Sequence, residues 1–345
     1  MTNREEQNRI SISRKLLLTL IAVGFALGIF VGAGMSLFTP LSPVKDNTAT
    51  GGPDGVFNFI RPPALLKGAE GSRPGKELKP FRYKVNEAIQ RVVQDGDVES
   101  VSVYFRDLNN GNRFGIGERE KILPTNLMKL PLMIAYFKWS ELSPVVLRKT
   151  LIYTGKEQQS APQAGKAASE LEPGKSYLVN DLIFRMIVRN DDAAFTVLSA
   201  NMPRPRLEKI YKELYVEYDP RKQDENMSLS AAAAFYRVLF NASYLSEEMS
   251  EKALRYLSRS SARNAMSAGL PPGLALSGKR GEQAFATADD EETPPLLQVH
   301  EFGIIYHANR PFLLGFMVRG RDADHINKTI RELTRLVYEE VDQQS

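Results

Sequence analysis

The sequence predicts an α+β domain that follows one membrane-spanning helix near the N-terminus. Three observations lead to this prediction. An unbroken apolar stretch occupies residues 16–38, and alternating apolar residues typical of strands occur near both ends of the chain beyond it. Helical patterns fill the middle and close the chain. Helices next to strands at the two ends can cover one face of an antiparallel sheet.

The apolar stretch 16–38 is long enough to cross a bilayer, because about 20 apolar residues span its hydrocarbon core as a helix. Positive residues on one flank favour the cytoplasmic side. We therefore expect residues 1–15 in the cytoplasm, an uncleaved single-pass anchor in the cell membrane, and an extracytoplasmic domain. The alternative is a cleaved signal peptide, which usually has a shorter apolar core. Four cations precede the stretch: Arg4, Arg9, Arg14 and Lys15.

Three glycines in this stretch lie four residues apart and share one helix face: Gly24, Gly28 and Gly32. Such spacing permits close helix contact, so dimerisation through this face is one interpretation. The other is the ordinary frequency of glycine in membrane helices. The spacing does not decide between them.

Residues 39–77 are rich in proline and glycine and lack periodicity, which predicts an extended linker. Within it, Val56, Phe57, Phe59 and Ile60 form a small apolar group that could dock on the domain or on the membrane surface. The folded domain is expected over residues 78–345.

Composition excludes several classes of function. The 345 residues include no cysteine, which excludes disulfides, thiolate metal sites and cysteine catalysis. The formal charge of +4 suits an anionic envelope surface, and no cationic run with interleaved aromatics indicates nucleic-acid binding. His300, His307 and His325 lack the spacing of metal ligands, so neither a metal nor another cofactor is expected.

The elements of the domain follow in order. A helical stripe ends at Gly96, two short strands flank a turn at residues 109–112, and a buried helix is predicted over residues 123–138. Another buried helix ends near residue 188. Two further strands are predicted at residues 302–306 and 313–318, and a closing helix over 322–341.

Lys129 is anomalous, because a cation in the first turn of an apolar helix is disfavoured by the helix dipole and by burial. It is expected to have a carboxylate partner, a functional role, or both. Asn126 or Thr125 is expected to cap the N-terminus of this helix, since short polar side chains accept hydrogen bonds from its free N–H groups.

These residues resemble the Ser-x-x-Lys helix of the class A β-lactamase and penicillin-binding serine hydrolase superfamily, with Asn126 in place of the serine. Two more family motifs occur in order. Asn190, Asp191 and Asp192 stand at Ser-x-Asn, and Lys279, Arg280 and Gly281 stand at Lys-Thr-Gly. The segment from His300 to Tyr306 resembles the family's His-Asp-x-Gly-x-x-Tyr strand.

The resemblance covers residues 81–340. It implies a β-lactamase-like fold, with a sheet built from both chain ends and a helical subdomain between them. It also implies that Asp192 lies close to Lys129, where an opposite charge favours the ammonium form of the lysine. Arg280 would stand where a small hydroxyl normally contacts the substrate carboxylate.

The motif substitutions remove the usual acylation chemistry, because an amide at Asn126 cannot replace an oxygen nucleophile. Thr125 is a poor substitute, since its side chain would point about 100° away around a helix. No equivalent of the deacylating glutamate is evident. The nearest carboxylates lie on a charged helix typical of a solvated face: Glu208, Glu213 and Glu217.

Each motif residue also has a structural interpretation. Asn126 is interpreted as a helix cap in preference to a chemical group, and Lys129 with Asp192 as a structural ion pair in preference to a ligand site. Lys279 and Arg280 are either surface charges or an anion site.

Two functions follow. The first is a non-catalytic envelope module, binding or scaffolding, in which a degenerate cleft binds a peptidoglycan peptide or another anionic ligand, or only stabilises the fold. The residues of that cleft would be Lys129, Asp191, Asp192, Lys279 and Arg280. The second is a β-lactamase or D-Ala-D-Ala peptidase that works by a variant mechanism.

Overall fold

The computed structural model describes residues 59–61, 78–155, 169–216, 227–260, 265–285 and 294–345. Its main sheet has the strand order β2-β1-β9-β8-β7, and every neighbouring pair is antiparallel. Two strands come from the start of the domain and three from its end: β1 Ser100–Asp107, β2 Arg113–Ile116, β7 Leu276–Phe285, β8 Leu296–Ile305 and β9 Phe312–Gly320. The predicted antiparallel sheet built from both chain ends is therefore confirmed.

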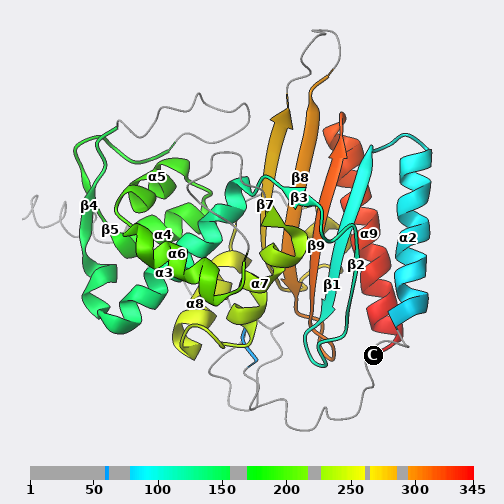
Figure 1. The fold of residues 1–345 in the computed structure, drawn as a ribbon, viewed down its shortest axis with the longest axis horizontal. Coiled ribbons are helices and arrows are strands. Elements are labelled where there is room, and N and C mark those ends of the chain that lie inside the picture. The colour runs from blue at the N-terminus through cyan, green and yellow to red at the C-terminus, as the bar shows by residue number, and fades with distance from the viewer. Residues whose placement is uncertain (1–58, 62–77, 156–168, 217–226, 261–264, 286–293) are drawn as a thin grey trace, which may run out of the picture. The chain divides into compact units, whose positions relative to one another are not determined.

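Two helices, α2 Leu78–Gln94 and α9 Ala323–Gln343, cover one face of this sheet (Figure 1). Alternate residues of the strands, such as Val103 and Phe105, pack against them in one hydrophobic cluster. The buried residues of α9 recur every three or four positions, as in an amphipathic helix: Ile326, Ile330, Leu333, Val337 and Val341.

Helix α7 Leu229–Phe240 packs on the other face of the sheet, against β1, β8 and β9. It belongs to a second hydrophobic cluster, which contains the central helix α3 Lys129–Leu142. The other elements of this part are η2 Thr125–Met128, η3 Pro144–Arg148, α4 Val179–Val188, α5 Asp192–Ala200, α6 Arg204–Glu213 and α8 Glu247–Ser258. The predicted helical subdomain between the two parts of the sheet is confirmed.

Short elements complete the described fold. Strand β3 Lys121–Ile122 pairs with β6 Met227–Ser228, and β4 Thr150–Ile152 pairs with β5 Ser176–Leu178. The turn η4 Ser267–Gly269 precedes β7 and packs against α9.

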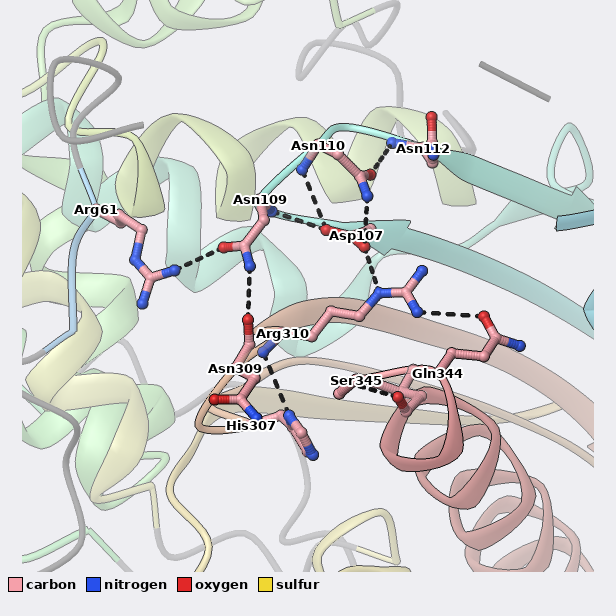
Figure 2. A network of polar contacts seen from close by, with 11 residues as sticks. Arg61, Asp107, Asn109, Asn110, Asn112, His307, Asn309, Arg310, Gln344 and Ser345 are labelled. Atoms are coloured by element: carbon pink, nitrogen blue, oxygen red, sulfur yellow. Dashed lines mark hydrogen bonds and ion pairs between the residues drawn. The ribbon is translucent and has the colours of Figure 1, made fainter. Parts of the chain in front are cut away.

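Asp107 ties the β1–β2 hairpin to the turn between β8 and β9 (Figure 2). Its buried carboxylate accepts a hydrogen bond from Arg310 Nε at 2.5 Å. It also accepts from the backbone N of Asn109 at 2.8 Å and from Asn110 Nδ2 at 2.9 Å. The predicted turn at residues 109–112 is confirmed, and Gly111 takes φ = +76° there.

Residues 59–61 lie against the domain, although the sequence places them in the predicted linker. The backbone N of Phe59 donates to the buried carboxylate of Glu251 at 2.8 Å, and its ring meets Tyr306 edge-on. The backbone N of Arg61 donates to Phe240 O at 2.8 Å. Phe59 and Ile60 are buried against the domain, which is one of the two alternatives given for this apolar group.

No helix in the described ranges is long and apolar enough to cross a membrane. The predicted cytoplasmic segment 1–15, the anchor 16–38 with Gly24, Gly28 and Gly32, and most of the linker lie outside the described residues. They stay predictions.

Candidate functional site

The site begins where η2 continues into α3: Thr125 and Asn126 lie in η2, and Lys129 is the first residue of α3. The predicted cap is wrong, because neither η2 nor α3 has a side-chain hydrogen bond at its N-terminus. The physical reason is the backbone: Thr125 lies inside a 3₁₀ turn with φ = +30°, which is strained for a β-branched residue. Asn126 therefore stands at the start of the helix without capping it.

Lys129 is enclosed by three oxygen acceptors. Its Nζ donates to Asp192 Oδ1 at 2.6 Å, to Asn190 Oδ1 at 2.9 Å and to the backbone O of Asn190 at 2.9 Å. The Lys129 side chain is only 2% exposed, whereas that of Asp192 is 51% exposed. An ammonium has three donors, so it can donate to each of these acceptors. The predicted contact between Lys129 and Asp192 is present.

The α4–α5 junction places these acceptors. Asn190 takes φ = +56°, a conformation that asparagine tolerates better than most residues. Asp191 is the N-cap of α5, and its Oδ1 accepts from the backbone N of Ala193 and Ala194. Its other oxygen accepts from Ser169 Oγ at 3.0 Å. Asp191 thus holds the junction, and its carboxylate is already engaged by these donors.

The Lys279-Arg280-Gly281 segment lies on β7, where successive side chains point to opposite faces. Lys279 is buried on the helical side and donates to Ile187 O at 2.9 Å, near the C-terminus of α4. Arg280 points to the α9 side, where its Nη1 donates hydrogen bonds to Asn327 Oδ1 at 2.8 Å and to Glu301 Oε2 at 3.4 Å. The structure does not bring Arg280 to Lys129 or Lys279, so the predicted anion site of adjacent cations does not form.

Thr125 and His300 form a contact that the sequence did not predict. Thr125 Oγ1 lies 3.1 Å from His300 Nε2. Gly281 pairs with His300 across β7 and β8, and a Cβ at Gly281 would overlap both Nε2 and Oγ1. The glycine of this motif is therefore needed to let the threonine reach the histidine. The sequence alone does not predict this contact, because it depends on the register in which β7 pairs with β8.

Burial shifts the pKa of two neighbouring groups on β8. Desolvation, with the nearby charge of Arg280, lowers the pKa of His300 to about 3, so its imidazole is neutral at physiological pH. Desolvation also raises the pKa of Glu301 to about 7, despite the opposing charge of Arg280. The Glu301 carboxylate accepts from the backbone N of Met266 at 2.9 Å.

Replacing Gly281 with alanine is expected to lower the free energy of unfolding by about 2 kcal/mol, because the added methyl group overpacks the Thr125–His300 contact. Urea unfolding of the full chain in a non-ionic detergent measures this change. Gly320→Ala is the control, since its Cβ would lie 3.4 Å from the nearest neighbouring heavy atom. Equal stability of the two variants would contradict the packing described for Gly281.

Glu301 and His300 are expected to give opposite pH dependences. Glu301 titrates at 4.5 when unfolded and about 7 when folded, so its contribution to the free energy of unfolding falls as pH rises through that interval. His300 titrates at 6.5 unfolded and about 3 folded, so its contribution rises with pH. The Glu301→Gln variant should therefore gain stability more steeply than the wild type between pH 4.5 and 6.5. Parallel curves from urea unfolding at several pH values would contradict this prediction.

Comparison with known proteins places this geometry in context. The model of the β-lactamase enzyme family (Beta-lactamase2) matches residues 84–341. No curated protein matches the sequence. In the described ranges, no three His, Cys, Asp or Glu side chains lie together in a way that could hold a metal ion.

Solved structures share the fold at low identity. The structure of PBP-A is 20% identical, with a TM-score of 0.63 over 79% of this chain and 98% of that chain. A β-lactamase from Chitinophaga pinensis is 16% identical, with a TM-score of 0.64 over 76% of this chain and 100% of that one. A β-lactamase from Xanthomonas campestris pv. campestris is 16% identical, with a TM-score of 0.61 over 75% and 97%.

Proposed function

The chain belongs to the β-lactamase enzyme family, and from this premise we propose that it is a non-catalytic member whose cleft binds a cell-wall peptide. The observation that carries the proposal is the enclosure of Lys129 by Asn190 and Asp192, in a helical segment that has Asn126 at the position of the family's serine. A lysine that acts as a base must lose a proton, whereas a carboxylate at 2.6 Å favours its ammonium form.

The contacts also bear on the ligand. Lys129 is neutralised by Asp192, and Lys279 donates to Ile187 O on the helical side. Of this pair, the half-exposed partner is the Asp192 carboxylate. A ligand that places a neutral or cationic group beside Asp192 therefore fits better than one that places an anion there. We place this module outside the cell, held to the membrane by residues 16–38.

A covalent penicillin probe tests the absence of catalysis. Full-length protein in non-ionic detergent is incubated with labelled penicillin, and its intact mass is measured. We expect no adduct. A stoichiometric adduct would overturn the proposal.

Peptide binding is tested separately by calorimetry with a synthetic wall pentapeptide ending in D-Ala-D-Ala. We expect binding, with the peptide recovered intact. In Asn126→Ala the dissociation constant should rise about five-fold, which corresponds to the loss of one hydrogen bond. The control is Asn201→Ala, at the far end of α5. Absence of binding, or equal affinity in the two variants, would contradict a role of the cleft in recognition.

The second candidate is a hydrolase of variant mechanism, which the Thr125–His300 contact favours. A neutral imidazole 3.1 Å from a hydroxyl can accept its proton as that oxygen attacks a carbonyl. The low pKa of His300 makes it a weak base, so we rank this function second. A penicillin adduct mapped to Thr125 by peptide mass spectrometry, and lost in Thr125→Ala, would establish it.

A further inference from the structure

Three arginines converge at the edge of the sheet opposite to the candidate cleft. Arg106 on β1 and Arg113 on β2 are directly paired in the antiparallel ladder. Directly paired residues point to the same face of a sheet. Strand β2 is one edge of the sheet and β7 is the other, so this group lies apart from the Lys279 segment.

The shared face is the one covered by α7. Tyr104, two residues before Arg106, packs in the cluster that contains α7, whereas Phe105 packs in the cluster of α2 and α9. Arg106 therefore points toward α7, which contributes Arg237. Burial lowers the pKa of Arg237 most, Tyr104 opposes this shift, and the positive charges of Arg106 and Arg113 lower the pKa further.

Little negative charge balances these three cations. Arg113 pairs with Glu118 at 3.1 Å. Arg106 and Arg237 form no ion pair with another described residue, and the buried Nε of Arg237 has no hydrogen-bond partner there. Like charges directly opposite each other destabilise a sheet, and a buried unpaired donor costs more. In the folded chain without a ligand, this cluster is therefore unfavourable.

The hairpin leaves room for the Arg106 guanidinium. A Cβ at Gly111 would lie 3.0 Å from Arg106 Nη2, so the glycine allows the side chain to lie over the turn. The three arginines come from three elements, β1, β2 and α7. A tetrahedral oxyanion offers oxygens in several directions, and planar guanidinium groups bind such oxygens in pairs.

We propose that Arg106, Arg113 and Arg237 form a binding site for a phosphate group. The bound phosphate supplies the missing acceptors and removes the repulsion among the three cations. Free inorganic phosphate and the headgroup of an anionic phospholipid share this chemistry. The site is independent of the proposed peptide cleft.

The test measures the melting temperature of the full chain in non-ionic detergent. Inorganic phosphate is compared with sodium chloride at equal ionic strength, and phosphatidylglycerol is compared with phosphatidylcholine in the same micelles. We expect at least one phosphate probe to raise the melting temperature by about 3 °C at about ten times its dissociation constant. A rise with inorganic phosphate alone identifies the free anion, and a rise with phosphatidylglycerol identifies the lipid.

The double variant Arg106→Gln, Arg237→Gln should lose this rise. Without phosphate it should melt at the same temperature as the wild type or higher, because repulsion has been removed, so misfolding is distinguishable from loss of binding. Arg335→Gln, on an exposed position of α9, is the control for one lost charge and should keep the rise. No rise with either probe, or a rise retained by the double variant, would overturn the proposal.

Discussion

Replacing Asp107 with alanine is expected to lower the free energy of unfolding by about 3 to 5 kcal/mol, the largest effect of any single change considered. The carboxylate is fully buried and accepts from Arg310 Nε at 2.5 Å. Its removal leaves the mostly buried Arg310 guanidinium without that charge. Breaking a buried pair by removing one partner costs this much because the other charge stays desolvated.

Urea unfolding of the full chain in non-ionic detergent measures the effect of Asp107→Ala. The control is Glu172→Ala, which removes an equally charged residue from an exposed ion pair with Lys175. That change should cost less than about 1 kcal/mol, since exposed pairs contribute little. If both variants unfold at the same urea concentration, Asp107 does not hold the hairpin in the way that Figure 2 shows.

Replacing Asp192 with alanine is expected to cost about 2 to 3 kcal/mol. The change removes the carboxylate at 2.6 Å from the buried Lys129 ammonium and keeps the neutral acceptors of Asn190. The cost is below that of Asp107 because Asp192 is half exposed, so water reaches its side of the pair.

A double-mutant cycle separates the ion pair from other effects of this change. Lys129→Met removes the buried charge and should cost about 1 kcal/mol or less, since the half-exposed Asp192 can be solvated. Asp192→Ala in the Lys129→Met background should then be nearly neutral. Equal costs of Asp192→Ala in the two backgrounds would show that the carboxylate does not stabilise the ammonium.

Periodicity predicts the α+β class, whereas the β-lactamase-like arrangement follows from the resemblance to the family motifs. The apolar residues of α9 recur at helical spacing, and those at residues 302–306 alternate. Both patterns show which face of the element is buried, and each can be read from a short segment of sequence. The order of the motifs predicts a contact between Lys129 and Asp192, and that contact is present.

The errors arose where backbone geometry or register decided the outcome. The left-handed Thr125 changed the start of the helix, so Asn126 does not cap it. The family motif predicts Lys279 and Arg280 in one cleft, whereas neighbours on a strand point to opposite faces. The opposition of Arg106 and Arg113 depends on hairpin register, and the turn residues alone do not specify that register.

The central claim is that Lys129 is held as an ammonium, so that restoring the missing hydroxyl alone does not restore acylation. The direct measurement is the intact mass of Asn126→Ser after incubation with penicillin, beside the triple variant Asn126→Ser, Asn190→Ser, Asp192→Asn. We predict no adduct on the single variant and an adduct on the triple variant. Rapid acylation of Asn126→Ser alone would contradict the claim.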